Sequence, residues 1–239
     1  MFTVSARLSG ENNKDYSYRV IKDAIMYLEL QPGQTISEIE LAEALQISRT
    51  PIREVMAKLR EEYLVEVFPQ VGTYVSKIKS QLIEEAAFMR VTLEKEVLKE
   101  SCESFPKEKL FELKRNIFLQ EELLGQKGTE RTFHKLDTDF HHIIFQGNNR
   151  ENVWGAIIRL STHYNRIRLL SEMKEHNLSD KIAQHKNIVK IIENKEVDQV
   201  EESVREHIIE PIKHWGDLYD PNSVYAHYLD LTHKMPVFQ

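Results

Sequence analysis

Apolar positions follow a helical spacing over the first sixty residues of the chain and then alternate in two short stretches. The pattern predicts three helices and two strands: Tyr16–Glu29, Glu38–Gln46, a helix from about Ser48, Val65–Phe68 and Thr73–Ser76. Ser37 is the candidate cap of the second helix, in which we expect Ile39, Ala42 and Leu45 to face inward. The hydroxyl of Ser48 is the candidate cap of the third helix. Two short helices, a tight turn, a third helix and a hairpin predict a winged helix-turn-helix.

The rest of the chain has a different character. From Gln81 to about Tyr219 the pattern is almost wholly helical, with breaks near Pro106 and at 125–128, 147–149 and 177–179. We expect about six helices in this region. The predicted fold class is therefore mainly α, with a winged helix-turn-helix DNA-binding domain at residues 1–78 and an all-α helical bundle at residues 79–239.

The third helix carries a basic face beside an apolar one. Its apolar residues have the spacing of a helix that packs on a core: Ile52, Val55, Met56 and Leu59. Arg49, Arg53 and Arg60 fall within about 40° of one another beside that stripe, whereas Lys58 points away. Guanidinium groups suit guanine O6 and N7 in the major groove, so this is a candidate recognition helix. Three arginines can also simply decorate a surface helix, but Gly72 at the hairpin bend, where a side chain would obstruct a phosphate, favours DNA.

Composition narrows the class of protein. The 239 residues are 41% hydrophobic and 29% charged, as in a globular protein, and the chain has no apolar run near the length of a membrane helix. The N-terminus lacks a secretory pattern and Cys102 is the lone cysteine, so we expect a cytoplasmic protein. Residues 1–78 hold nine Lys and Arg against eleven Asp and Glu. A DNA-binding surface there must therefore concentrate its positive charge on one face.

The string S-R-T-P-I-R-E-V at residues 48–55, followed by G-T-Y-V at 72–75, closely resembles the winged-helix domain of the GntR family of bacterial regulators. The resemblance runs over Tyr16–Lys77. It implies that Arg49, Thr50 and Arg53 are the main DNA contacts and that Gly72 lies at the wing tip. Two residues depart from the family pattern, since Tyr63 and Gln46 stand where the family usually has glycine.

Ionisable residues occur in the second half at positions where a bundle would place aliphatic side chains. Asp137 and His141 are one helical turn apart on an apolar face, and His185 and His207 face inward on two other predicted helices. A buried unpaired carboxylate is costly, so these groups must satisfy one another or a cation. Aspartate with three histidines suits a divalent metal ion such as Zn²⁺, Ni²⁺ or Mn²⁺, with positions left for water or a ligand carboxylate. A hydrogen-bonded core cluster is the alternative, and His134 and His214 are rival ligands.

The same residues, D-T-D-F-H at 137–141 with His185 and His207, resemble the FCD ligand-binding domain of the FadR-like branch of the GntR family. In metal-containing members an aspartate and three histidines hold the ion, so the resemblance implies Asp137, His141, His185 and His207 as ligands. Arg90 begins the string R-V-T-L-E, which matches the family's R-x-x-L-E and implies an effector-binding arginine that clamps a carboxylate. From spacing alone, an ion pair between Arg90 and Glu94 is equally compatible.

These observations predict a homodimeric, sequence-specific transcriptional regulator, a repressor, that binds double-stranded operator DNA. A small organic acid effector in the metal-containing helical domain would bind the DNA-competent and incompetent arrangements unequally. A metal-dependent enzyme that uses the helical domain is the second hypothesis. The chain has no nucleophile elbow, phosphate loop or dinucleotide fingerprint, which favours the regulator and indicates that the protein is not an enzyme. A third possibility is a purely structural ionisable site without an effector.

Overall fold

Three N-terminal helices form around the apolar positions that the pattern identifies. The computed structural model describes residues 2–175 and 178–232, and its first helices are α1 (Asn13–Met26), α2 (Glu38–Leu45) and α3 (Arg49–Glu61). Ser37 caps α2 as predicted, because its hydroxyl accepts the backbone N–H of Glu40 at 3.3 Å. Ser48 occupies the N-cap of α3, but its hydroxyl makes no cap hydrogen bond to a described residue, so that expectation is wrong.

The inward face of α2 is narrower than predicted. Ala42 and Leu45 are buried, whereas Ile39 is 48% exposed, so the expectation that Ile39 faces inward is wrong. The buried face of this short helix is centred on Leu41, and Ile39 lies roughly 160° around the helix from it.

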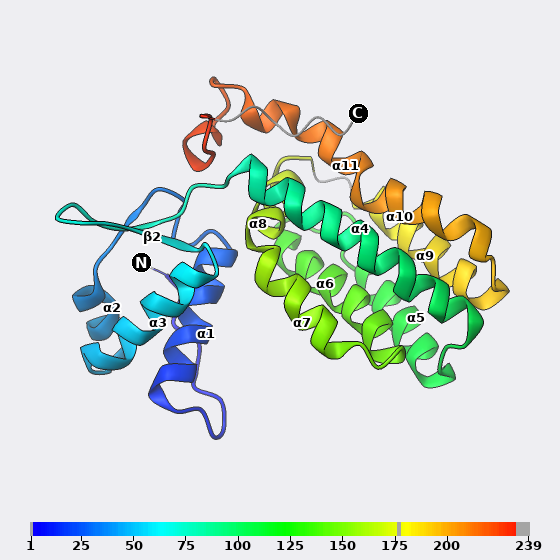
Figure 1. Cartoon of the computed structure of the whole chain (residues 1–239), viewed down its shortest axis with the longest axis horizontal. Coiled ribbons are helices and arrows are strands. Elements are labelled where there is room, and N and C mark those ends of the chain that lie inside the picture. The colour runs from blue at the N-terminus through cyan, green and yellow to red at the C-terminus, as the bar shows by residue number, and fades with distance from the viewer. Residues whose placement is uncertain (1, 176–177, 233–239) are drawn as a thin grey trace.

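A small antiparallel sheet completes this part of the chain. Its strands are β1 (Thr35–Ile36), β2 (Val65–Phe68) and β3 (Gly72–Val75), in the order β1-β3-β2. The hairpin of β2 and β3 was expected, with β3 beginning one residue earlier than predicted and pairing Glu66 with Tyr74. The sequence pattern did not predict β1, because two residues are too few for alternation. The hairpin extends away from the bundle as a wing (Figure 1).

Four of the described non-glycine residues of this domain adopt the left-handed conformation, and two of them end α2 and follow α3. Gln46, the C-cap of α2, has φ 55°, and Tyr63, just after α3, has φ 58°. These are the two positions at which the sequence lacks the family's glycines. The left-handed region costs a residue with a Cβ roughly 1–2 kcal/mol. The turns therefore keep their geometry at a cost in stability.

Helices make up the described remainder of the chain, with short 3₁₀ segments at 197–199, 214–219 and 226–228. The α-helices are α4 (Ser80–Glu103), α5 (Lys107–Glu121), α6 (Glu130–Gly147), α7 (Glu151–Leu160), α8 (Thr162–Glu175), α9 (Ser179–Asn194), α10 (Val200–Ile208) and α11 (Glu210–Lys213). The described residues of this region form eight α-helices, whereas about six were expected. The chain breaks at Ser161 between α7 and α8, and a separate short helix, α11, has Pro211 in its first turn. No helix in the described ranges has the length and hydropathy needed to span a membrane.

The buried apolar side chains form two cores. One involves residues between Tyr16 and Val75, and the other begins with Leu28 and Ile78 and includes the helices from α4 onward. The C-terminal segment returns to the junction of the two, where Leu229 pairs with Ile78 in a parallel bridge. The helix α8 lies at this junction as well (Figure 1). Residues 161–172 are all buried, although many of them are polar.

Candidate functional site

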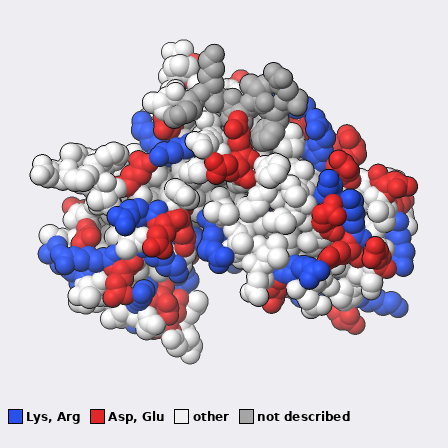
Figure 2. All heavy atoms as spheres, in the orientation of Figure 1, with Lys and Arg blue, Asp and Glu red and all other residues white. Residues whose placement is uncertain are grey.

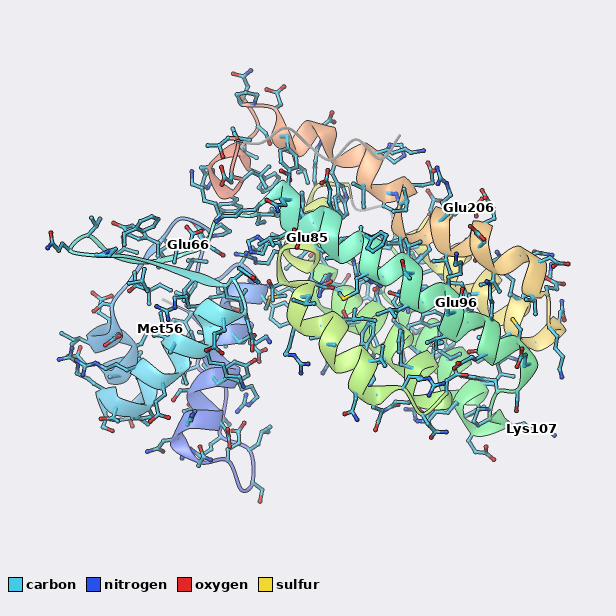
Figure 3. All side chains as sticks on the ribbon, in the orientation of Figure 1. Met56, Glu66, Glu85, Glu96, Lys107 and Glu206 are labelled. Atoms are coloured by element: carbon cyan, nitrogen blue, oxygen red, sulfur yellow. The ribbon has the colours of Figure 1, made fainter. Side chains whose placement is uncertain are left out.

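Three helices bring one aspartate and three histidines together inside the bundle. Asp137 and His141 lie on α6, His185 on α9 and His207 on α10, and one ligand atom from each falls within 4.8 Å of the others. Glu206, labelled in Figure 3, marks the turn of α10 that carries His207. All four side chains are buried. The structure therefore assembles the four residues that the sequence indicated as candidate metal ligands.

Oxygen acceptors outside the cluster fix which nitrogen of each histidine faces inward. The Nδ1 atom of His185 lies 2.8 Å from Gln120 Oε1, and that of His207 lies 3.0 Å from Gln184 Oε1. An amide oxygen accepts only, so in both rings the proton is on Nδ1 and the Nε2 lone pair is free. The Nδ1 atom of His141 lies 2.6 Å from Glu94 Oε2 and is held in the same way. Acceptors of this kind orient metal-binding histidines.

The Nε2 atoms that face inward lie close to one another and to the Asp137 carboxylate. Nε2 of His141 and Nε2 of His207 are 2.9 Å apart, and two lone pairs at that distance repel unless a proton or cation lies between them. Nε2 of His185 is buried and has no hydrogen-bond partner among the described residues. It lies 3.6 Å from Asp137 Oδ1. Three imidazole nitrogens and a carboxylate in this arrangement fit a divalent cation.

The protonation states also match those of metal ligands. Burial lowers the pKa of His185 to about 3 and the pKa of His207 well below its ordinary value, so both rings are neutral at pH 7. Burial alone would raise the pKa of Asp137, but the neighbouring Arg168 guanidinium outweighs it and holds that pKa well below its usual range. A metal ion requires neutral imidazoles and an ionised carboxylate.

Two arginines line the side of the cluster that faces α8. Arg168 donates from Nη2 to Asp137 Oδ2 at 2.5 Å, and Arg90 donates from Nε to Glu94 Oε1 at 2.6 Å. The ion pair with Glu94, the alternative from spacing alone, is thus present. Arg90 nevertheless also lines a cavity of about 10 Å³. The full lining is Arg90, Asp137, Tyr164, Arg168, Lys181, His207 and Pro211. This cavity holds about one water, and each of its three cations pairs with a carboxylate: Arg90 with Glu94, Arg168 with Asp137 and Lys181 with Glu172.

The two rival histidines, His134 and His214, lie outside the cluster. His134 lies against Glu172, with Nδ1 3.0 Å from Oε2, and His214 belongs to the 3₁₀ segment after α11. Sequence reasoning missed Arg168, Lys181 and the two glutamines that hold the imidazoles. The signal in the sequence was weak: N-R-I-R at residues 165–168 places two arginines in one helix, with no periodicity that says they point inward.

The predicted DNA-binding residues lie on the outside of the N-terminal part. Arg49, Thr50, Arg53 and Arg60 are all exposed on α3, and the three arginines lie beside the buried stripe that includes Met56, labelled in Figure 3. Figure 2 shows lysine and arginine gathered over the end of the molecule where α2 and α3 lie, with acidic residues among them. Arg53 is tethered by Glu38 on α2, with Nε 3.1 Å from Oε2.

Lys58 and Gly72 are the other two residues of this region for which the sequence made a prediction. Lys58 does point elsewhere, since its ammonium lies 3.5 Å from the centre of the Tyr18 ring. Gly72 begins β3 beside the wing turn with φ 151°, a value that L side chains rarely adopt. A Cβ there would stand 3.5 Å from the Tyr74 ring. The glycine is therefore explained by its backbone conformation more than by lack of space.

Family models match both halves of the chain. The model of the FCD domain matches residues 85–210, and the model of bacterial regulatory proteins of the gntR family matches residues 17–75. The "HTH-type transcriptional repressor RspR" of Escherichia coli (strain K12) is 27% identical over 193 residues, 81% of this chain and 84% of the relative. An "Uncharacterized HTH-type transcriptional regulator in unstable DNA locus" of Streptomyces ambofaciens is 29% identical over 204 residues, 85% of either chain.

Solved structures share the fold. The structure "E. coli McbR/YncC" superposes with a TM-score of 0.75 at 17% identity and covers 88% of this chain and 100% of its own. A putative transcriptional regulator GntR from Rhodococcus sp. RHA1 gives a TM-score of 0.73, with 87% of this chain and 99% of that chain covered. At 17% identity each likeness speaks for the fold alone.

Proposed function

The chain belongs to the GntR family of bacterial regulatory proteins and carries an FCD domain, and we propose that it is a repressor controlled by a small carboxylate ligand. It is a DNA-binding transcriptional regulator, and not an enzyme. We place the boundary between its two domains at residue 78, where the two apolar cores meet. The observation that carries the proposal is the exposure of Arg49, Arg53 and Arg60 on one face of a helix whose neighbouring face is buried.

In this proposal α3 enters the major groove of the operator. Arg49 and Arg53 read base edges with their guanidinium groups, Thr50 and Arg60 contact the backbone, and the turn at Gly72 approaches a phosphate. Glu38 bonds only Nε of Arg53. The two terminal nitrogens are left to form a fork, which suits guanine O6 and N7.

The histidine cluster is proposed to hold a divalent metal ion through Asp137, His141, His185 and His207. Support comes from the three Nε2 atoms that face one another and from the Nε2 atom of His185, which is buried without a hydrogen-bond partner in the described residues. The bound ion would supply coordination positions for an anionic ligand. Arg90, Arg168 and Lys181 line the adjoining cavity and would bind a carboxylate group of that ligand.

A second copy of the chain is proposed to pack on the bundle. Figure 2 shows a broad uncharged area over α4 and α7, while the exposed Glu85 and Glu96, labelled in Figure 3, lie on α4 at its border. Gly155 and Ala156 on α7 are small and half-buried, which lets a helix approach closely. Two copies would present two α3 helices to the halves of a palindromic site.

Selection from a random pool of double-stranded DNA, followed by footprinting, tests the DNA-binding part. We expect Arg53→Ala to weaken binding to the selected site by about 1–3 kcal/mol, the cost of losing one direct base contact. Lys58→Ala is the matched control, because Lys58 is a cation of the same helix that lies over Tyr18. Equal affinities of Arg53→Ala and the unaltered protein would refute the assignment of α3.

Metal analysis tests the second part. We expect the purified protein to bind about one Zn²⁺ per chain with a raised melting temperature, and Asp137→Ala to lose that binding. A thermal-shift screen of small carboxylic acids, with and without a chelator, then identifies the ligand class. If a chelator changes neither the melting temperature nor the DNA affinity, the proposal that a metal ion controls DNA binding is refuted.

A further inference from the structure

The first turn of α8 reaches the end of the helix proposed to read DNA. Thr162 donates from its hydroxyl to the carbonyl oxygen of Glu62 at 3.0 Å, and Nε2 of His163 lies 2.9 Å from the carbonyl oxygen of Tyr63. Glu62 is the C-cap of α3 and Tyr63 follows it. The carbonyls at a helix end have no partner within the helix and need one elsewhere. Here a helix 100 residues further along supplies one donor to each carbonyl, and the hydroxyl of Ser76 supplies a second donor to Tyr63 at 2.6 Å.

The His163 ring also fixes the start of α4. Its Nδ1 accepts the backbone N–H of Lys79 at 3.0 Å, so the proton is on Nε2 and is donated to Tyr63. Burial and the neighbouring Arg166 charge lower the pKa of His163 well below its ordinary value, which keeps this neutral form at pH 7. One imidazole thus connects the last turn of α3 with the segment that leads into the bundle.

Arg166 makes this junction hard to rearrange. It is fully buried, and its guanidinium donates to the carbonyl oxygen of Ser76 at 2.8 Å and to the hydroxyl of Ser76 at 3.0 Å. These are neutral acceptors, so the buried charge depends on each of these bonds for its solvation. Any shift of α8 relative to Ser76 would leave a buried cation unsatisfied, which is strongly unfavourable.

The same helix contacts the candidate metal site. Two residues after Arg166, Arg168 binds Asp137 Oδ2 at 2.5 Å, and the Tyr164 ring lies 4.9 Å from the Arg90 guanidinium. One helix of 14 residues therefore touches both the aspartate of the cluster and the end of α3. A cation at the cluster would compete with Arg168 for the Asp137 carboxylate. That competition changes the bond that holds the middle of α8.

We propose that Thr162 and His163 are positioning residues for DNA binding: they hold the end of α3 in place and transmit changes at Asp137 and Arg168 to it through α8. This inference rests on the proposed function for the role of α3. It adds that the DNA-reading unit is not complete within residues 1–78, because the bundle supplies a donor to the Glu62 carbonyl and one of the two donors to the Tyr63 carbonyl.

The test uses the full chain and Zn²⁺ alone as the probe. Amide hydrogen exchange of residues 60–64 is measured with and without Zn²⁺, together with the affinity for Zn²⁺ and for the selected DNA site. Thr162→Val removes the donor and keeps the shape. Thr92→Val is the matched control, because Thr92 donates at 2.8 Å to Phe88 of its own helix on the exposed side of α4. Thr162→Ser restores the donor.

In the unaltered protein, in Thr92→Val and in Thr162→Ser, we expect Zn²⁺ to change exchange at residues 60–64 and the DNA affinity by about 5-fold or more. In Thr162→Val, and more strongly in His163→Ala, both responses shrink while the Zn²⁺ affinity stays within about twofold. The proposal is overturned if both variants keep the full response, if they lose Zn²⁺ affinity in parallel, or if Zn²⁺ leaves exchange at residues 60–64 of the unaltered protein unchanged. An exchange response in a protein that selects no DNA site would instead refute the proposed function and leave the link through α8 standing.

Discussion

The hydrogen bond from His185 to Gln120 offers a sharp test of the metal proposal. Gln120 is fully buried on α5, its Oε1 accepts from His185 Nδ1 at 2.8 Å, and its amide nitrogen donates to Asn116 at 2.6 Å. Gln120→Met keeps the length and volume of the side chain and removes both bonds. The His185 proton is then free to move to Nε2, where it would block the nitrogen that faces the cluster.

Two magnitudes follow from this geometry. Loss of an acceptor that orients a metal-binding histidine lowers metal affinity about 10–100-fold, or roughly 1.4–2.7 kcal/mol. In the metal-free protein, the Nδ1–H group of His185 is left buried without an acceptor, which costs about 1–3 kcal/mol of folding stability. For a protein of this size that loss lowers the melting temperature by about 2–4 °C per kcal/mol.

The two effects are measured separately. Competition with a chromophoric chelator at 25 °C, where the variant is folded, gives the Zn²⁺ affinity, and urea titration of the metal-free protein gives the stability. Gln81→Met is the control, since Gln81 is exposed on α4 and its amide bonds only Glu85 at 3.0 Å. If Gln120→Met loses stability and binds Zn²⁺ as tightly as the unaltered protein, the inward lone pair of His185 has no role as a ligand.

Three further predictions concern other parts of the chain. Gln46→Gly, which relieves the left-handed C-cap of α2, should raise the free energy of unfolding in urea by about 0.5–1 kcal/mol. Glu38→Gln, which frees the Arg53 side chain, should reduce discrimination between the selected site and random DNA about 3- to 10-fold in competition binding, whereas Glu43→Gln on the exposed side of α2 should not. The metal-free protein should lose stability as the pH falls below 6.5, because burial lowers the pKa of His163, His185 and His207 in the folded state and the unfolded state binds protons that the folded state does not. The slope in urea titrations should approach about 1.4 kcal/mol per pH unit for each of these histidines and should be smaller in His163→Gln.

Local periodicity was sufficient for α3 and for the inward-facing pair Asp137 and His141, whereas the choice of His185 and His207 over His134 and His214 came from the family resemblance. The stripe of Ile52, Val55 and Leu59 is fully buried, because a helix with one apolar face has one way to pack. Asp137 and His141 were predicted to share a face by their spacing, and the structure confirms this. Which atoms of the histidines face inward was beyond prediction, since the glutamines that hold His185 and His207 come from other helices: Gln120 from α5 and Gln184 from α9.

The parts that sequence reasoning missed depend on long-range partners. The helix α8 has no apolar stripe to reveal an orientation, because it is surrounded by protein and its buried side chains include Asn165, Arg166 and Glu172. Burial of such groups is decided by hydrogen-bond partners 38 to 90 residues away, such as Ser76, which accepts from Arg166, and His134, which donates to Glu172. A pattern confined to one segment carries no information on those partners.

The buried charged residues of α8 affect how a change at the cluster reaches α3. An apolar helix in the place of α8 could pack at least as stably, since buried ion pairs seldom add net stability over well-packed hydrophobic side chains. Such a helix could also slide, because apolar contacts are not directional. The directional bonds of Thr162, His163 and Arg166 in the first turns of α8, and of Arg168 at its middle, oppose sliding. A change at Asp137 must then either break these bonds or move α8 as one body, and a helix that moves in this way carries α3 with it.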